Sequence, residues 1–325
     1  MQQATAIAHP NIALIKYWGK RDSRLNLPAV GSLSITLDAL CTRTRVCFDS
    51  TLGADSFLLD GVGADARRVT ACLDHLREAA RIDTRARVES SNDFPTAAGL
   101  ASSASGFAAL VVAADAALGL GLPAEKLSMH ARRGSGSAAR SIFGGFVEMS
   151  RGRRQDGTDA VARPLLAAED WPLEVVIVIT DSDAKSLGSS AAMMSTESAP
   201  YYAAWVRSSH PDLRAAREAV LAHDFDALAN VSVHSCLKMH ALMMAARPPV
   251  MYWNAATVAC VRRITALREA GLAVFYTIDA GPQVKAICQP EARDAVEHAL
   301  RSIAGVAELR RSGLGGAAHV VEGAA

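Results

Sequence analysis

The chain has 325 residues, enough for one large domain or two moderate domains with hydrophobic cores. Its 34 basic and 33 acidic residues give a net charge of +1, so no overall field draws it to nucleic acid or to a membrane surface. No apolar run reaches the roughly 18 residues that a membrane span requires, and six scattered cysteines lack a Cys-x-x-Cys pair. We therefore expect a cytoplasmic protein with reduced thiols.

Strands and helices are mixed in the first half of the chain. Apolar alternation predicts strands over 4–16 with a break at Pro10, and over 33–37, 42–48, 85–89 and 142–149. Helical spacing predicts helices over 65–81, 107–118 and 127–133. Segments 134–140 and 150–163 are rich in small or polar residues and are expected to be loops.

The second half is mostly helical between 196 and 268, with breaks expected near Pro200, Pro211 and Pro248. Strands are predicted over 173–180, 273–278, 284–289 and 319–321, and a helix over 291–302. The elements do not alternate strictly between strand and helix, which favours an α+β fold. We expect a division into domains 1–180 and 181–325.

The segment 90–106 runs a loop of small and hydroxyl residues directly into an apolar helix. The first turn of a helix has backbone N–H groups without internal partners and a partial positive charge, so an anion is stabilised there. This favours a phosphate site, although the same residues are also ordinary helix-capping residues. The loop lacks the Gly-Lys-Ser/Thr ending of a Walker A motif.

Three other segments carry polar groups suited to anions. The first is 16–22, where Tyr17 and Lys20 can face a ligand if the strand ends in a turn at Gly19; the alternative is a solvated strand end. The second is 132–140, where the guanidinium of Arg140 suits carboxylate or phosphate oxygens, or is simply a surface charge. The third is 185–190, whose serines could be ordinary loop residues.

Asp279 follows an apolar strand and precedes a Gly-Pro turn. It is either a turn former or a general base, and nearby cations would keep it ionised. The histidines show no zinc-binding spacing, and neither a Gly-x-Ser-x-Gly elbow nor an N-terminal Gly-x-Gly-x-x-Gly is present. These absences argue against zinc chemistry, that type of hydrolase and dinucleotide binding.

Together the motifs resemble the diphosphomevalonate decarboxylases of the GHMP kinase superfamily. The resemblance rests, in chain order, on Lys16-Tyr17-Trp18-Gly19-Lys20-Arg21-Asp22, Leu25-Asn26-Leu27-Pro28, Thr96-Ala97-Ala98-Gly99-Leu100-Ala101-Ser102-Ser103-Ala104, Gly136-Ser137-Ala138-Ala139-Arg140-Ser141, Lys238-Met239-His240-Ala241 and Asp279-Ala280-Gly281-Pro282. It implies an N-terminal domain like domain 2 of ribosomal protein S5, a ferredoxin-like C-terminal α/β sandwich and an active site between them. It also implies ATP-dependent decarboxylation of (R)-5-diphosphomevalonate through phosphorylation of its 3-hydroxyl, with ATP and Mg²⁺ and a homodimeric assembly.

The resemblance also implies roles for individual residues. Asp279 would be the base, Arg140 would hold the substrate carboxylate, and Lys20 would add catalytic positive charge. Binding of the substrate is expected from Tyr17, Trp18, Gly19, Lys20, Arg68, Ser135, Gly136, Ser137, Ala138, Ala139, Arg140, Ser189 and Ser190. Binding of ATP is expected from Ala98, Gly99, Leu100, Ala101, Ser102, Ser103 and Ser105, with no protein ligand assigned to a metal.

Ser190 departs from relatives that carry arginine at this position, and matches as a hydroxyl those that carry threonine. Two other functions remain open from the sequence. One is a kinase of the same superfamily that phosphorylates mevalonate or its phosphate without decarboxylation. The other is a non-catalytic ATP-binding protein.

Overall fold

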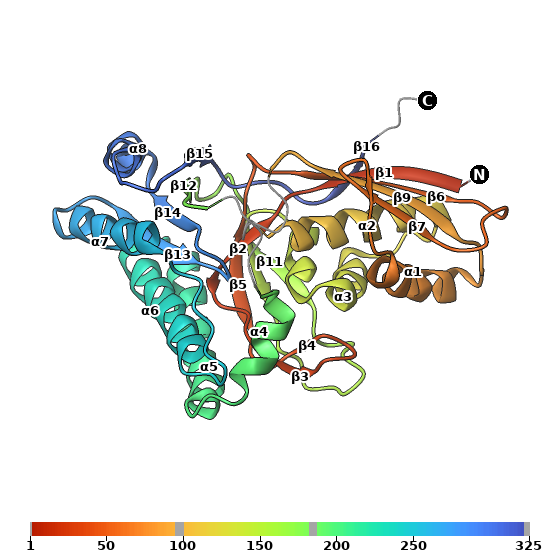
Figure 1. Cartoon of the computed structure of the whole chain (residues 1–325), viewed down its shortest axis with the longest axis horizontal. Helices are drawn as coiled ribbons and strands as arrows, with labels where there is room; N and C mark the ends of the chain where they lie inside the picture. The colour runs from red at the N-terminus through yellow and green to blue at the C-terminus, as the bar shows by residue number, and fades with distance from the viewer. Residues whose placement is uncertain (1, 95–100, 182–186, 322–325) are drawn as a thin grey trace.

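The computed structural model describes residues 2–94, 101–181 and 187–321. Figure 1 shows two parts side by side, with the chain's first sheet and helices α1 to α3 in one and helices α5 to α8 in the other. In the described residues, three sheets and a small hairpin organise the chain, and the second sheet lies between the two parts and packs into the cores on both sides. No helix within the described ranges has the length and apolarity to cross a membrane.

The first sheet has the strand order β16-β1-β6-β9-β7-β8 and is antiparallel apart from the β7–β9 pair. Buried and exposed residues alternate along β6 and β9, as expected for a sheet with one face on a core. Helix α2 packs on that face against β1 and β6. The strands are β1 (Gln2–Ala8), β6 (Thr42–Phe48), β7 (Ser56–Leu59), β8 (Val62–Gly63), β9 (Ala86–Asn92) and β16 (His319–Val321).

The helices of this part are α1 (Arg67–Ala80), α2 (Ser102–Leu118), α3 (Ala124–Gly134) and the 3-10 helix η1 (Gly136–Ile142). Helix α2 is buried on nearly all sides, so it contacts the first sheet, α1, α3 and η1 at once. It ends at Gly119, which takes the left-handed conformation (φ 64°) that glycine adopts without strain.

The second sheet is the layer between the two parts, in the order β11-β10-β5-β2. Its strands β2 (Asn11–Ile15) and β5 (Ser32–Thr36) are buried throughout. A sheet with one solvent-exposed face would instead show alternating buried and exposed residues. Ile12 and Ile35 share a core with Phe275 from the C-terminal half. The other two strands are β10 (Phe146–Met149) and β11 (Ala162–Leu166).

The third sheet, β13-β14-β12-β15, consists of β12 (Glu174–Ile179), β13 (Val274–Ile278), β14 (Val284–Cys288) and β15 (Glu308–Ser312). In β12, β13 and β14, odd-numbered residues such as Val175 and Phe275 pack toward the second sheet. Even-numbered residues of these three strands, such as Val176 and Val274, share a core with residues of α7 and α8. The remaining elements are hairpin β3 (Lys20–Asp22) and β4 (Leu27–Pro28), helices α4 (Ser189–Thr196), α5 (Tyr202–Leu221), α6 (Phe225–Met244), α7 (Ala255–Glu269) and α8 (Arg293–Arg301), and the 3-10 helix η2 (Pro290–Ala292).

These elements confirm the α+β prediction and most of the predicted strands and helices. Three predictions were wrong in detail. Segment 134–140 contributes to the 3-10 helix η1 rather than a loop, and α4 begins at Ser189 within a segment expected to be a loop. Pro211 lies inside α5 instead of breaking it; both Pro211 and Arg207, whose carbonyl loses its helical donor, are exposed to water.

The domain boundary at residue 180 stays a prediction. Strand β12 ends at Ile179 and pairs with β14 and β15, so this strand lies in the sheet of the C-terminal half. Strand β16, from the other end of the chain, returns to pair with β1.

Candidate functional site

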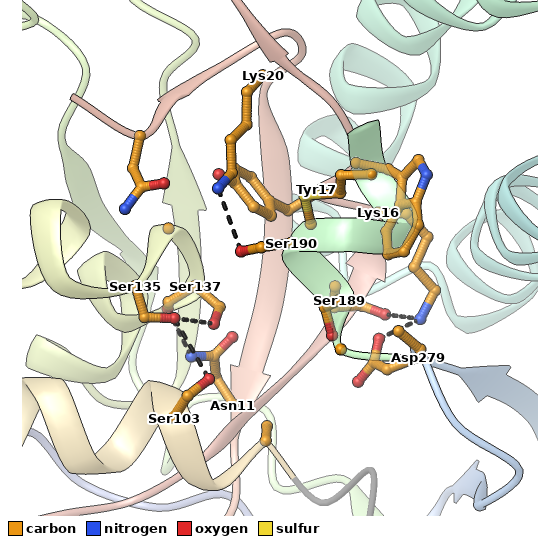
Figure 2. A pocket seen from close by; sticks show the side chains of 18 of the residues that line it. Asn11, Lys16, Tyr17, Lys20, Ser103, Ser135, Ser137, Ser189, Ser190 and Asp279 are labelled. Carbon is orange, nitrogen blue, oxygen red and sulfur yellow. Dashed lines mark hydrogen bonds and ion pairs between the residues drawn. The ribbon is translucent and has the colours of Figure 1, made fainter. Parts of the chain in front are cut away.

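A cavity of about 530 Å³ lies where the two halves of the chain meet. Figure 2 shows Asn11, Ser103, Ser135 and Ser137 on one side of it and Lys16, Ser189, Ser190 and Asp279 on the other. Its wall comes from β2 and the residues that follow it, from η1, from the first turns of α2 and α4, and from the end of β13. Segments more than 200 residues apart in sequence thus contribute to one site.

The closest charged contact in the cavity joins Lys16 to Asp279. The Lys16 Nζ lies 2.6 Å from Asp279 Oδ1 and also donates to the Ala13 carbonyl at 2.9 Å. Lys16 is 1% exposed, whereas the side chain of Asp279 is 24% exposed. The lysine is therefore a fixed buried cation, and the carboxylate that it holds reaches the cavity.

Asp279 stays ionised at neutral pH. Burial by itself would raise the pKa of its carboxyl, but Lys16, Lys285 and Arg140 together outweigh burial and bring the pKa below its ordinary value. The surroundings supply an anionic oxygen that can accept a proton, as the sequence analysis anticipated.

Arg140 is held rigidly in the wall of the cavity. It is 2% exposed, and its Nε donates to Asn11 Oδ1 at 3.1 Å and Ser34 Oγ at 2.9 Å, while Nη1 donates to Ser32 Oγ at 2.6 Å. Burial lowers the pKa of the guanidinium to about 10, so it remains charged at neutral pH. Its hydrogen bonds go to neutral partners, and its positive charge is left for a ligand or for Asp279.

Tyr17 and Gly136 pack against each other in the wall of the cavity. The hydroxyl of Tyr17 is buried and has no hydrogen-bond partner among the described residues. Burial raises its pKa to about 12, so it is a neutral donor. A Cβ on Gly136 would overlap this hydroxyl and its ring, so the glycine lets the backbone of η1 approach the tyrosine.

Lys20 and Arg68 place two further cations at the cavity. Lys20 Nζ lies 3.2 Å from Ser190 Oγ, a contact between the β3–β4 hairpin and α4 that Figure 2 shows. Arg68 donates to the Gly134 carbonyl at 2.8 Å and lies over the Phe107 ring. Burial lowers the pKa of both side chains, and Arg68 lowers that of Lys20 further.

Hydroxyls and helix ends complete the cavity. Ser135 Oγ lies 3.3 Å from both Ser103 Oγ and Ser137 Oγ, which links α2 to η1. The first turns of α2 and α4 both line the cavity, through Ser102 and Ser189 among others. Backbone N–H groups and the positive ends of two helix dipoles thus add to the attraction for anions.

A second cavity of about 250 Å³ adjoins the first, because both are lined by Arg68, Ser102 and Ser103. Its wall is largely apolar, with Phe57, Leu59, Val69, Phe107 and Leu110. A ligand with an apolar, flat part and an anionic part could occupy both cavities through the serines at the start of α2.

The structure brings most of the predicted site residues together. The first cavity is lined by Tyr17, Trp18, Lys20, Arg68, Ala101, Ser102, Ser103, Ser135, Gly136, Ser137, Arg140, Ser189, Ser190 and Asp279. Four others do not line it: Gly19, Ser105, Ala138 and Ala139. Ser105 is fully buried, 2.6 Å from Thr42 Oγ1, and the two alanines are fully buried. Ala98, Gly99, Leu100 and Lys185 lie outside the described residues.

Sequence reasoning missed Lys16 and Asn11 as site residues. Lys16 begins the Lys-Tyr-Trp-Gly-Lys motif, yet nothing in the local sequence distinguishes a buried lysine from a solvated one before its distant carboxylate is known. Asn11 Nδ2 donates to the Ser137 carbonyl at 3.0 Å and to Ser141 Oγ at 2.7 Å, while its Oδ1 accepts from Arg140. Its place at the start of a buried strand was the available signal.

The described residues contain no group of three or more histidine, cysteine or acidic side chains that could hold a metal ion.

Family models match nearly the whole chain. Residues 8–162 match the diphosphomevalonate decarboxylase-like N-terminal domain, and residues 175–313 match the mevalonate 5-diphosphate decarboxylase C-terminal domain. The diphosphomevalonate decarboxylase mvd1 of Aspergillus fumigatus is 36% identical over 93% of this chain and 81% of its own length. The human diphosphomevalonate decarboxylase is 38% identical over 86% of this chain and 74% of its own length.

Solved structures agree with these matches. A structure described as MDDEF in complex with MVAPP, AMPPCP and magnesium is 36% identical, covers 99% of both chains and has a TM-score of 0.91. The mevalonate diphosphate decarboxylase of Staphylococcus aureus is 35% identical over 99% of this chain and 98% of its own, with a TM-score of 0.92.

The contact between Gly136 and Tyr17 gives a test of the packing. Gly136→Ala should lower the free energy of unfolding by about 1–3 kcal/mol, since the added methyl group must displace a buried ring. Gly106→Ala is the matched control: its Cβ would meet nothing within 4 Å inside α2, so helix propensity should raise stability by about 0.5–1 kcal/mol. Urea unfolding measures both values, and equal effects in the two variants would contradict the described packing.

Proposed function

The chain belongs to the diphosphomevalonate decarboxylase family, and from this we infer that its principal cavity carries out the reaction of that family. The protein is an ATP-dependent decarboxylase that converts (R)-5-diphosphomevalonate to isopentenyl diphosphate, with release of ADP, phosphate and CO₂. It thereby acts in the mevalonate pathway of isoprenoid biosynthesis. ATP and Mg²⁺ take part in the reaction.

One observation supports this proposal above the others. Asp279 is the one carboxylate among the described residues that line the cavity, and the same lining carries four cations, Lys16, Lys20, Arg68 and Arg140. A substrate with a diphosphate at one end and a carboxylate at the other requires this distribution of charge. The single anionic side chain is then available for a proton rather than for a metal.

We assign Asp279 as the base that accepts the proton of the 3-hydroxyl. A tertiary alcohol is a poor nucleophile, and phosphoryl transfer is mostly a matter of positioning and charge neutralisation. The proton leaves late, when the new P–O bond has made the oxygen acidic, so a carboxylate of low pKa suffices as the acceptor. Lys16 keeps this carboxylate charged and fixes its direction.

We assign Arg140 to the substrate carboxylate. Hydrogen bonds to Asn11, Ser32 and Ser34 orient its planar guanidinium before the ligand arrives. The diphosphate is assigned to the other cations and donors that line the cavity, which are Tyr17, Lys20, Arg68, Ser135, Gly136, Ser137, Ser189 and Ser190. The buried, unpaired hydroxyl of Tyr17 would gain a partner in that arrangement.

We assign ATP to the second cavity and to the N-terminus of α2. The apolar wall formed by Phe57, Leu59 and Phe107 suits the base, and Ser102 and Ser103 at the junction of the cavities suit the phosphates. Mg²⁺ supplies charge neutralisation of the phosphate oxygens when it is bound with the nucleotide.

Phosphorylation prepares the substrate for decarboxylation. Hydroxide is a very poor leaving group, whereas phosphate leaves readily, so loss of phosphate from C3 can accompany loss of CO₂ from the carboxylate. The C–C bond electrons form the new double bond as the C–O bond to phosphate breaks. Lys20 and Arg140 would stabilise the departing phosphate and orient the carboxylate.

We also propose a cytoplasmic location and a homodimer. All six cysteines are free thiols, which suits a reducing compartment. Large apolar side chains are exposed on α4, α6, α7 and the segment before α7, namely Met194, Leu237, Val258 and Met251. A second copy could cover them.

The pairing of β12 with β14 and β15 favours a domain boundary ahead of β12, rather than at residue 180.

The reaction and the base can be tested together. The purified protein with ATP, Mg²⁺ and mevalonate 5-diphosphate should release ADP and CO₂ in equal amounts. In Asp279→Asn, which keeps the shape of the side chain, turnover should fall by about 10²- to 10⁴-fold with little change in substrate KM. ADP without CO₂ would identify a kinase, release of neither would identify a binding protein, and near-normal turnover in Asp279→Asn would remove the base assignment.

The carboxylate assignment has its own test. Arg140→Lys should lose more than about tenfold in kcat/KM despite the retained charge, because an ammonium cannot donate two parallel hydrogen bonds to a carboxylate as the planar guanidinium does. Arg163→Lys, at an exposed position paired with Glu125, is the control and should match the wild type. If Arg140→Lys loses less than tenfold, bidentate carboxylate binding by this residue is wrong.

The assembly is tested by sedimentation equilibrium. We expect twice the chain mass of 34.2 kDa at micromolar concentration. Met251→Asp should shift the equilibrium toward monomer if this exposed methionine is covered in the dimer. A monomer in the wild type would exclude the dimer proposal.

A further inference from the structure

Helix α6 contains the Lys238-Met239-His240-Ala241 motif, to which the proposed function gives no role beyond Met239 in the cavity wall. One face of this helix is buried through Ser232, Ser235, Cys236, Met239, His240 and Met243. The spacing of three and four residues places these side chains on a single stripe. The stripe packs against β2 and β13, the two strands that deliver Lys16 and Asp279.

His240 contacts the residue immediately before Asp279. Its Nε2 lies 3.2 Å from the Ile278 carbonyl oxygen, and the ring is 2% exposed. A carbonyl only accepts, so the ring carries its hydrogen on Nε2 and donates it. Burial lowers the pKa of His240 to about 3, which keeps the ring neutral, and the Trp253 ring covers it at 4.8 Å between centroids.

Two neighbours of His240 on the same stripe, Cys236 and Ser235, also hydrogen-bond to backbone groups near the ion pair. Cys236 Sγ accepts from the Ile278 backbone N–H at 3.3 Å, so both polar backbone groups of Ile278 are bound by α6. Ser235 Oγ accepts from the Lys16 backbone N–H at 3.1 Å. Neighbouring residues of one helix therefore bind the backbone of Lys16 and the backbone of Ile278, the residue before Asp279.

We propose that His240 is a positioning residue for the reaction: through the Ile278 carbonyl it fixes the end of β13, so that the Asp279 carboxylate meets both Lys16 and the substrate hydroxyl. Ser235 has the matching role for Lys16. This inference rests on the proposed role of Asp279 as the base, and it assigns His240 no contact with the substrate.

A displacement of the backbone at Asp279 can be measured through the pKa of its carboxyl, because that pKa depends on the charged and titratable groups around it. They are Lys16 directly after β2, Lys285 from β14, Arg140 from η1, and Cys236 and His240 from α6. The cations lower the pKa of Asp279 only at short range. If the end of β13 moves away from Lys16, that pKa rises, and turnover that needs the ionised carboxylate is lost at a higher pH as the solution is acidified.

Four variants separate positioning from general stability. His240→Leu removes the imidazole N–H and leaves the longer contact of Cys236 Sγ with the Ile278 carbonyl oxygen at 3.6 Å. His240→Gln keeps an N–H that can reach this carbonyl. His234→Leu is the matched control, because it makes the same replacement on the exposed side of α6. Ser235→Ala removes the acceptor of the Lys16 N–H. Each is assayed in the full chain for kcat, both KM values, the pH profile of kcat and the melting temperature.

We expect His240→Leu to lose about 10- to 100-fold in kcat with smaller changes in both KM values. The acidic limb of its kcat–pH profile should move to higher pH, and the acidic limb of Ser235→Ala should shift in the same direction. His240→Gln should recover most of kcat. His234→Leu should match the wild type. Unchanged kcat and pH profile in a folded His240→Leu, or equal losses in the Leu and Gln variants, would overturn the proposal.

If His240→Leu fails to fold, the Gln and Ser235→Ala pH profiles decide the question: a wild-type acidic limb in Ser235→Ala, or a fully lost kcat in folded His240→Gln, overturns it. The proposed function fails differently. Near-normal turnover in Asp279→Asn would remove the base itself, whereas an inactive Asp279→Asn beside an unaffected His240→Leu would remove only the role of His240.

Discussion

The ion pair between Lys16 and Asp279 is the constraint on which the site depends. Its members are 263 residues apart in sequence, and Lys16 is almost fully buried. A buried charge is tolerated only when it is paired and hydrogen-bonded, and removing one member of such a pair costs about 3–5 kcal/mol. The two halves of the chain must therefore come together in one register before either charge is satisfied. Strand β2 of the second sheet, which lies between the two parts, fixes how the two halves align.

Burial of cations gives the cavity its selectivity for anions. Arg140, Lys20 and Arg68 are each partly or fully withdrawn from water, and burial lowers the pKa of all three. Arg140 and Arg68 donate to neutral oxygens instead of carboxylates, so much of their charge is uncompensated until a ligand arrives. An anionic substrate recovers the free energy that desolvation of these groups costs, and the two helix N-termini add to this attraction.

Much of the fold and the site could be predicted from the sequence where the signal was local. Strand β6 was predicted residue for residue because Thr42–Phe48 alternates, and the stripe of Val69, Cys72, Leu73 and Leu76 marked α1. The short polar strands β3 and β15 were missed, since Lys20-Arg21-Asp22 and Arg310-Arg311 carry no apolar pattern. Strand β3 forms by pairing with β4 in a hairpin, and β15 forms by pairing with the distant strand β12. The break expected at Pro211 was wrong because an exposed helix face can expose the unpaired carbonyl to water.

The same distinction between local and long-range signals holds for the residues of the site. Asp279, Arg140 and Lys20 stood out by motif, but Lys16, Asn11 and His240 act through partners that the sequence does not place beside them. Ser105 belonged to a motif and proved to be a core hydroxyl beside Thr42. Local pattern thus identified the groups that face the cavity better than the groups that hold them in position.

The central claim is that Lys16 sets the ionisation of Asp279 across the two halves. The direct measurement is a ¹³C NMR titration of protein labelled at aspartate carboxyl carbons, with the Asp279 signal assigned by its absence from Asp279→Asn. In the wild type its pKa should lie below the ordinary value of 3.8. In Lys16→Met, burial should dominate and the pKa should rise above that value. A pKa of Asp279 that does not change when Lys16 is replaced would contradict the account.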